Sequence, residues 1–170
     1  MARKVNDQNT KRRNFIPFFE KLYRIRARIG EMVINQAKIQ VLLVTLIWFR
    51  SLKKFPRKNI KNWELKLLDN TLGTLIFIFE GFSYNSEQNL VTSLKKFNEI
   101  RNKIMHKINF YEGKIAISYG DRKVDFGSIK KSLVEINGEA REIINELEEL
   151  TRHEHQELFN TVFKKHEKQQ

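Results

Sequence analysis

A seven-member apolar repeat near the C-terminus is the feature that most constrains the fold of this chain. Its members alternate spacings of four and three residues: Ile129, Leu133, Ile136, Ala140, Ile143, Leu147 and Leu150. Because this spacing keeps one apolar side chain on the same side of every turn, it predicts a long helix that packs against other helices. A seam between two chains and packing inside a helical bundle use the same spacing, and we expect the second.

Most of the remaining chain also favours helix. A helix can begin at Pro17, and the strongly apolar run over residues 31–54 is expected to be the central core helix, ended by Pro56. Shorter helices are expected over residues 63–68, 72–79 and 86–108. The predicted fold class is therefore all-α, a bundle of helices.

Residues 113–126 are the exception to the helical pattern. Apolar and polar residues alternate on both sides of Gly120 and Asp121, a pair that suits a two-residue turn. The pattern predicts a small β-hairpin about this turn.

The length of 170 residues suits one compact domain. We expect residues 1–14, which are polar and basic, to form a flexible tail, and residues 15–170 to form a single helical domain. The chain has no cysteine, no recognisable secretion signal, and in residues 41–49 an apolar stretch far shorter than the roughly 20 residues that cross a bilayer. These features predict a cytoplasmic protein with no membrane partner.

The charge of the chain is unevenly distributed. Residues 1–134 carry 27 Lys and Arg against 11 Asp and Glu, whereas residues 135–157 carry 2 against 8. A basic body attracts polyanions, which favours RNA as a partner, although anionic lipid would be attracted too. A Lys- and Asn-rich composition with no particular partner is the alternative interpretation.

One short segment, Arg101-Asn102-Lys103-Ile104-Met105-His106, carries candidate chemistry. A cation, an amide and an imidazole within six residues can hold an RNA phosphate and move a proton beside it without a metal. The sequence contains no glycine-rich phosphate loop, no HExxH and no GxSxG, so nucleotide-driven, zinc-protease and serine-hydrolase functions are unsupported.

This segment resembles the motif of the HEPN superfamily, an Arg followed by a polar residue, with a His four to six residues further on. The matching residues are Arg101, Asn102 and His106. The resemblance implies an all-helical, dimeric endoribonuclease of bacterial toxin or phage-defence type, acting without metal or cofactor at a dimer cleft. Some members carry a tyrosine two residues after the histidine, which a partner nucleotidyltransferase modifies; Ile108 stands there, so that kind of antitoxin is not expected.

The proposed roles follow from the chemistry of each group. His106 would act as general base on the ribose 2′-hydroxyl or as general acid at the leaving 5′-oxygen, giving a 2′,3′-cyclic phosphate. Arg101 would stabilise charge on the phosphoryl oxygens, and Asn102 would orient His106 or bind a phosphate. Three further cations on the same helix are expected to bind RNA: Lys95, Lys103 and Lys107. A partner protein, such as an antitoxin or another defence component, is also expected.

At 100° per residue, Arg101 falls in the middle of the apolar stripe of its helix, about 140° from His106. Either Arg101 reaches around its own helix, or a second copy completes the site across a two-fold axis, as the resemblance favours.

The runner-up function is a non-catalytic HEPN-like module that binds RNA or a protein. A DNA-binding protein is less favoured because no recognition helix is evident. We expect His153-Glu154-His155 to be solvated, since histidines two residues apart point to different sides of a helix.

Overall fold

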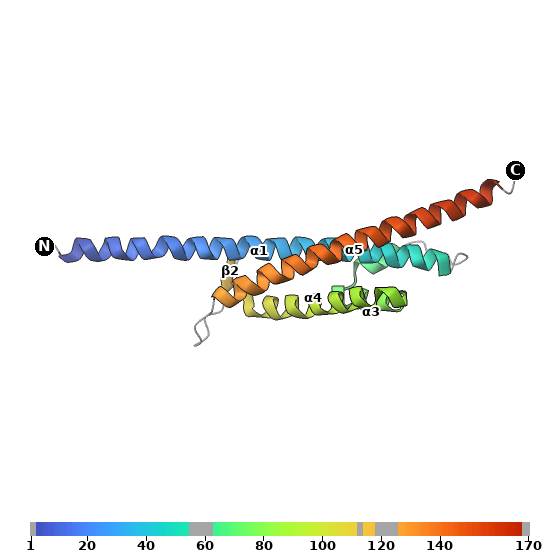
Figure 1. The fold of residues 1–170 in the computed structure, drawn as a ribbon. Helices are drawn as coiled ribbons and strands as arrows, with labels where there is room; N and C mark the ends of the chain where they lie inside the picture. The colour runs from blue at the N-terminus through green and yellow to red at the C-terminus, as the bar shows by residue number, and fades with distance from the viewer. Residues whose placement is uncertain (1–2, 55–62, 112–113, 118–125, 168–170) are drawn as a thin grey trace.

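The computed structural model describes residues 3–54, 63–111, 114–117 and 126–167, which are mainly helical (Figure 1). Two long helices, α1 (Arg3–Lys54) and α5 (Phe126–Glu167), lie side by side and run in the same direction. Asn137 Nδ2 donates to the Arg28 carbonyl across 3.0 Å, and nearer the other end Arg50 Nε donates to Glu154 across 2.9 Å. From the first contact to the second, the residue numbers rise in both helices, so the helices are parallel.

The shorter helices cover one side of this pair. The elements are α2 (Trp63–Leu68), α3 (Leu72–Glu80), a 3₁₀ turn η1 (Asn85–Glu87) and α4 (Gln88–Lys107). In Figure 1, α3 and α4 lie below α1 and α5. Helix α4 runs antiparallel to α5, since Lys96 near its middle pairs with Glu139 whereas Ile104, further along, lies near Ser132.

The hydrophobic core lies between α1, α3, α4 and α5. The fully buried large side chains include Phe79 from α3, Phe97 from α4 and Ile47 from α1. All seven members of the four-three repeat in α5 belong to the core or pack against it, so the repeat serves packing inside the chain, as expected. The described helices confirm the all-α fold class.

Several helix boundaries follow from local sequence. Helix α1 ends at Lys54, shortly before Pro56, which disfavours helix in the residue that precedes it. The Thr71 side chain accepts a hydrogen bond from the backbone N–H of Thr74 and so caps α3. The predicted helices at 63–68 and 72–79 are present, the second extended to Glu80.

The start of α1 differs from the expectation. The helix begins at Arg3 rather than at Pro17, so the backbone of residues 3–14, expected as a flexible tail, is helical. Pro17 lies inside the helix, where its ring removes one backbone hydrogen bond without ending the helix.

The hairpin is present but displaced. Strand β1 (Ile108–Tyr111) pairs antiparallel with β2 (Lys114–Ile117), with Ile108 opposite Ile117. The segment predicted as the first strand is therefore the second strand, and it pairs with residues 108–111, of which only Ile108 was expected in the helix over residues 86–108. Ile108-Asn109-Phe110-Tyr111 is rich in β-branched and aromatic residues, which favour a strand. The predicted turn at Gly120 and Asp121 lies outside the described residues.

The apolar part of α1 is longer than residues 41–49. Residues Tyr23–Lys54 contain an 18-residue window whose length and composition would also suit a membrane crossing. In this fold, 44% of that window is buried inside the protein. The core helix of a soluble protein can have the same length and apolar composition. One such helix is weak evidence for a membrane span.

Candidate functional site

The motif residues lie near the C-terminal end of α4. Leu90, Leu94, Phe97 and Ile104 on the core-facing side of this helix are buried, and Arg101 lies among them, half-buried. An arginine on a core stripe must find a carboxylate, carbonyl groups or water, because an isolated buried charge costs several kcal/mol.

Arg101 has no carboxylate partner among the described residues. Its Nη1 donates to Asn102 Oδ1 across 2.7 Å, while its Nε is buried and has no hydrogen-bond partner. No ion pair in the described part of the chain involves this guanidinium. Arg101 is therefore a cation whose hydrogen-bonding capacity is only partly used.

The structure places Asn102 between the other two motif residues. Asn102 is half-buried and bound to Arg101, and His106 is exposed one turn further along the helix. The guanidinium thus turns away from the centre of the apolar stripe and toward the side of α4 that carries Asn102 and His106. Of the two arrangements considered from sequence, this pairing favours Arg101 reaching part of the way around its own helix. A site shared between two copies stays a prediction.

Two of the expected RNA-binding lysines form ion pairs at the surface. Lys95 pairs with Glu80 across 2.7 Å, and Lys103 pairs with Glu99 one turn away on the same helix. The hydrogen bond and charge of Lys103 lower the pKa of Glu99 below its ordinary value. Exposed pairs of this kind contribute little to stability, so a phosphate could replace the carboxylates. The side chain of Lys107 is outside the described residues.

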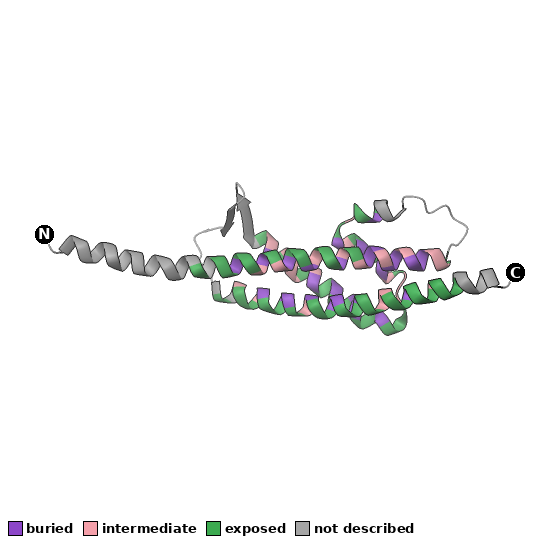
Figure 2. Ribbon diagram, turned by 90° about the horizontal axis from the view of Figure 1, so that it is seen from above, coloured by how far each residue is buried: buried purple, intermediate pink, exposed green. Residues whose placement is uncertain are grey.

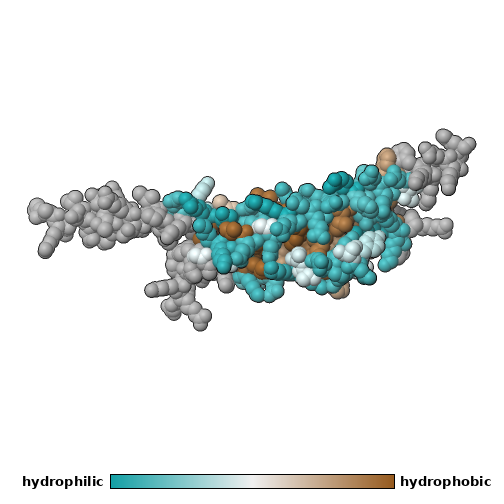
Figure 3. Space-filling model, in the orientation of Figure 1, coloured by the Kyte–Doolittle hydropathy of each residue, from teal (hydrophilic) through white to brown (hydrophobic). Residues whose placement is uncertain are grey.

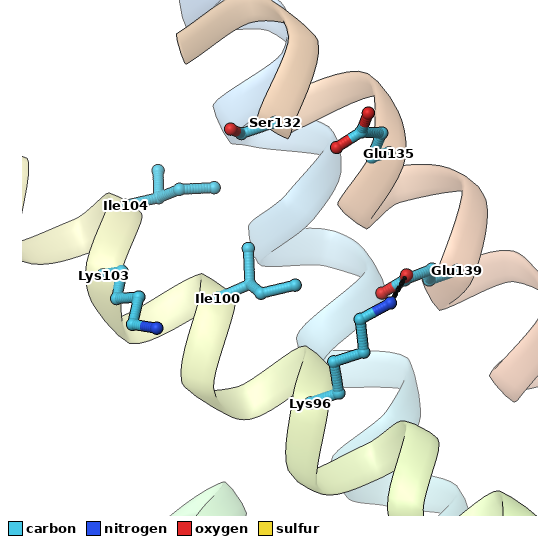
Figure 4. A pocket seen from close by; sticks show the side chains of 7 residues that line it. All are labelled: Lys96, Ile100, Lys103, Ile104, Ser132, Glu135 and Glu139. Carbon is cyan, nitrogen blue, oxygen red and sulfur yellow. Dashed lines mark hydrogen bonds and ion pairs between the residues drawn. The ribbon is translucent and has the colours of Figure 1, made fainter. Parts of the chain in front are cut away.

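A cavity of about 410 Å³ opens beside the motif helix, between α4 and α5 (Figure 4). Lysines line its α4 side and carboxylates its α5 side: Lys96, Ile100, Lys103, Ile104, Ser132, Glu135 and Glu139. Lys96 and Glu139 form an ion pair across it, and their hydrogen bond raises the pKa of Lys96. Neither Arg101 nor His106 lines this cavity, so the cavity is separate from the side of α4 that carries Asn102 and His106.

A buried ion cluster joins α1, η1 and α5 at the opposite end of the bundle. Arg50 donates to Glu87 through both Nη atoms, at 2.7 and 2.6 Å, and to Glu154 through Nε at 2.9 Å. It also donates to the Phe82 carbonyl across 3.0 Å and lies over the Tyr84 ring. Burial lowers the pKa of Arg50, but its hydrogen bonds and charge interactions with Glu87 and Glu154 outweigh burial, and the net shift is upward.

This cluster was not predicted from the sequence. Glu154 was expected to be solvated with its two flanking histidines, whereas its side chain is buried. His153 and His155 are exposed, and the ring of His155 lies 5.8 Å from that of Phe49. A usable signal existed, because Arg50 is the only charged residue in residues 39–52, where a buried charge requires a buried partner. Each side-chain nitrogen of Arg50 and each carboxylate oxygen of Glu87 and Glu154 has a hydrogen-bond partner, which marks a structural clamp rather than a binding site.

No group of three or more His, Asp or Glu side chains in the described part of the chain is arranged to hold a metal ion.

The sequence matches no protein-family model, no curated protein and no solved structure at a significant level.

Proposed function

We propose that this protein is a metal-independent endoribonuclease of HEPN type that binds RNA along the α4 strip formed by Arg101, Asn102 and His106. The observation that carries the proposal is the state of Arg101, a half-buried guanidinium with an unused donor and no carboxylate partner among the described residues. Such a cation lacks an anion in the described part of the protein, and a phosphodiester would supply one.

The chemistry that fits these groups is attack by the ribose 2′-oxygen on the adjacent phosphorus. A general base takes the 2′-hydroxyl proton as the new P–O bond forms, and a general acid gives a proton to the departing 5′-oxygen as the old bond breaks. The products are a 2′,3′-cyclic phosphate and a 5′-hydroxyl. His106 can serve in either step, and Arg101 stabilises the additional charge on the phosphoryl oxygens.

A second acid-base group is required if both proton transfers are catalysed. Among the described residues no hydrogen bond or ion pair joins His106 to a carboxylate or another imidazole. A second copy of the chain would supply a second His106, which agrees with the dimeric site implied by the HEPN resemblance. A bacterial toxin or phage-defence role in the cytoplasm, with an antitoxin or other partner protein, belongs to the same proposal.

The incompletely paired Arg101 also favours one alternative, a binding protein that is not an enzyme. If Arg101 only holds an anion and His106 transfers no proton, the strip binds RNA or a protein partner without cleaving it. RNA binding that depends on Arg101 but releases no product would identify such a non-catalytic module.

The test is incubation of the purified protein with a labelled RNA containing loops and single strands, in excess EDTA. We expect cleavage with a 2′,3′-cyclic phosphate end, abolished by His106→Ala and retained by His153→Ala, a control that removes another exposed histidine. Activity lost in EDTA and restored by a divalent cation would contradict the metal-independent mechanism. Binding without cleavage at any protein concentration would favour the alternative.

A further inference from the structure

Cations from three helices lie at the same level of the bundle as the motif residues. We call them the basic tract: Arg24 and Arg28 of α1, Lys103 of α4, and Lys130 and Lys131 of α5. Arg28 is half-buried, and the other four side chains are exposed. The three groups are far apart in the sequence, so only the packing of the helices brings them to one level.

The contacts of Asn137 set the level of α5 against α1. Asn137 accepts a hydrogen bond from Asn35 across 3.3 Å and donates one to the Arg28 carbonyl across 3.0 Å. Lys130 precedes Asn137 on α5 by about two helical turns. Because the helices are parallel, Lys130 also lies about two turns before these contacts along α1, level with Arg24 and Arg28. Figure 2 shows α1 and α5 side by side here, with exposed residues along both.

Helix α4 brings the motif to the same level. Ile104 of α4 and Ser132 of α5 line one cavity, and His106 is two residues further along α4, toward the start of α5. Lys103 also lines this cavity (Figure 4), and at 100° per residue its position is about 60° from that of His106 around the helix. Lys103 therefore lies between His106 and α5.

The tract cations hold only exposed carboxylates. Three of them pair with a residue one turn away on their own helix: Arg24 with Glu20, Lys103 with Glu99, and Lys131 with Glu135. Lys130 and Arg28 form no ion pair with a described residue. Because exposed pairs of this kind contribute little free energy, a phosphate can replace their carboxylates at little cost.

We infer that RNA bound at the α4 strip passes Lys103, crosses the outer side of α5 and reaches α1, so that the basic tract forms part of its binding site. The inference rests on the proposed function and defines its substrate class, an RNA with several nucleotides on one side of the scissile phosphate. Packed helices lie about 8–10 Å apart, so the path from α4 across α5 to α1 is about 20 Å long. A stacked strand advances about 3.4 Å per nucleotide, so roughly six nucleotides cover this path. A dinucleotide would be too short to reach α1.

Helix α1 continues past the start of α5 at this end of the bundle (Figure 1). In the sequence, residues 3–19 carry 5 Lys and Arg against 1 Asp and no Glu. An RNA longer than the tract would therefore meet further positive charge in this direction.

RNA fits this tract better than an anionic membrane does. A helix that binds a membrane surface combines its cations with a broad apolar side that enters the lipid. The α5 side of the cavity beside the tract instead carries polar residues, Ser132 and Glu135. The face of the molecule in Figure 3 is mostly hydrophilic, with hydrophobic residues in separate patches. A chain of phosphates can follow cations from one helix to the next without any apolar contact.

The first experiment measures RNA affinity by fluorescence anisotropy in the His106→Ala protein, so that the readout does not depend on cleavage. The tract variant carries Lys130→Gln and Lys131→Gln; its matched control carries Lys66→Gln on α2 and Arg152→Gln in the C-terminal half of α5, both at exposed positions. With a single strand of about 20 nucleotides, we expect about tenfold weaker binding in the tract variant alone. The slope of log affinity against log salt concentration should fall by about 1.4, because each phosphate contact contributes about 0.7. Equal losses in the tract variant and its control would overturn the inference.

The second experiment removes a negative charge from the tract. Glu135 is exposed, lies one turn from Lys131 and is separated from it by 3.9 Å. Because its carboxylate repels a phosphodiester, Glu135→Gln should tighten RNA binding by about threefold. Glu149→Gln, at an exposed position further along α5, is the control and should leave the affinity unchanged. Unchanged or weaker binding by Glu135→Gln would contradict the proposed path across α5.

A series of RNA lengths separates this inference from the proposed ribonuclease activity. In the His106→Ala protein, affinity should rise between RNAs of about four and about ten nucleotides, and the tract variant should lose this gain. Cleavage by wild type, together with a tract variant that binds like its control, would overturn the tract and leave cleavage at the α4 strip standing. Tract-dependent RNA binding without cleavage would support the tract and contradict the ribonuclease. Tract-dependent binding to vesicles that contain phosphatidylserine, with RNA affinity unaffected, would show a membrane surface and overturn the inference.

Discussion

Arg101 donates from Nη1 to Oδ1 of Asn102 across 2.7 Å, so the guanidinium turns from the core stripe toward the polar side of α4. The arginine nevertheless leaves its Nε buried without a partner. Position 101 is therefore occupied by a residue that serves packing poorly and suits anion binding well.

Replacement of Arg101 by methionine should stabilise the protein while removing RNA binding. Methionine has similar length, fills the same space and buries no unpaired N–H, whose burial costs about 1–3 kcal/mol. We expect the free energy of unfolding, measured in urea, to rise by roughly 1 kcal/mol. RNA affinity is measured by fluorescence anisotropy on the same sample. A fall in stability of several kcal/mol would mean that the guanidinium is a structural group.

Replacement of His106 by alanine should affect cleavage alone. His106 is exposed on the polar side of α4, where substitutions usually change stability by less than about 0.5 kcal/mol. We expect unchanged RNA affinity within about twofold and loss of cleavage of at least about 100-fold, the usual contribution of a general acid or base. Equal cleavage rates for wild type and His106→Ala would remove His106 from the chemistry.

Replacement of Glu154 by glutamine should destabilise the clamp between α1 and α5. The amide can still accept one hydrogen bond, but buried Arg50 and half-buried Lys53 lose a shared negative charge. We expect a loss of about 3 kcal/mol in the free energy of unfolding, as for other broken buried ion pairs. Glu149→Gln, on the exposed side of the same helix, is the matched control and should change it by less than about 0.5 kcal/mol. Similar losses for both variants would show that the cluster contributes nothing specific.

The contribution of Lys53 should disappear in alkaline solution. Burial lowers the pKa of Lys53, but hydrogen bonds and charge interactions with Glu154 and Glu157 outweigh burial and hold the pKa above 10.5. A cation whose pKa is raised by folding stabilises the folded state fully below the unfolded pKa, and that stability is lost as the pH rises through the folded pKa.

Wild type should therefore be more stable than Lys53→Met at neutral pH, by about 1 kcal/mol or less because Lys53 is partly exposed. The difference between the two proteins should shrink above pH 10.5, the ordinary pKa of lysine. Urea unfolding at several pH values measures this difference in the free energy of unfolding. A constant difference across the alkaline range would show that Lys53 acts through packing and not through its charge.

The sequence by itself determined the positions of most helices and the place of Arg101 on one of them. Periodic side chains are a local property, so the repeat in α5, the segments at 63–68 and 72–79, and the position of Arg101 on an apolar stripe could all be predicted. The alternation in residues 114–117 predicted a strand correctly, but it did not identify the partner strand, because residues on both sides could pair with it.

Only the tertiary structure decided which helices meet and in which direction. The parallel alignment of α1 with α5 brings Arg50 to Glu154, which is 104 residues away in the chain. The residues around either position do not predict such a pairing. For the same reason a glutamate between two exposed histidines was expected in solvent although it is buried. Burial of a charge depends on a distant counter-charge that lowers its cost, and that counter-charge is supplied by packing.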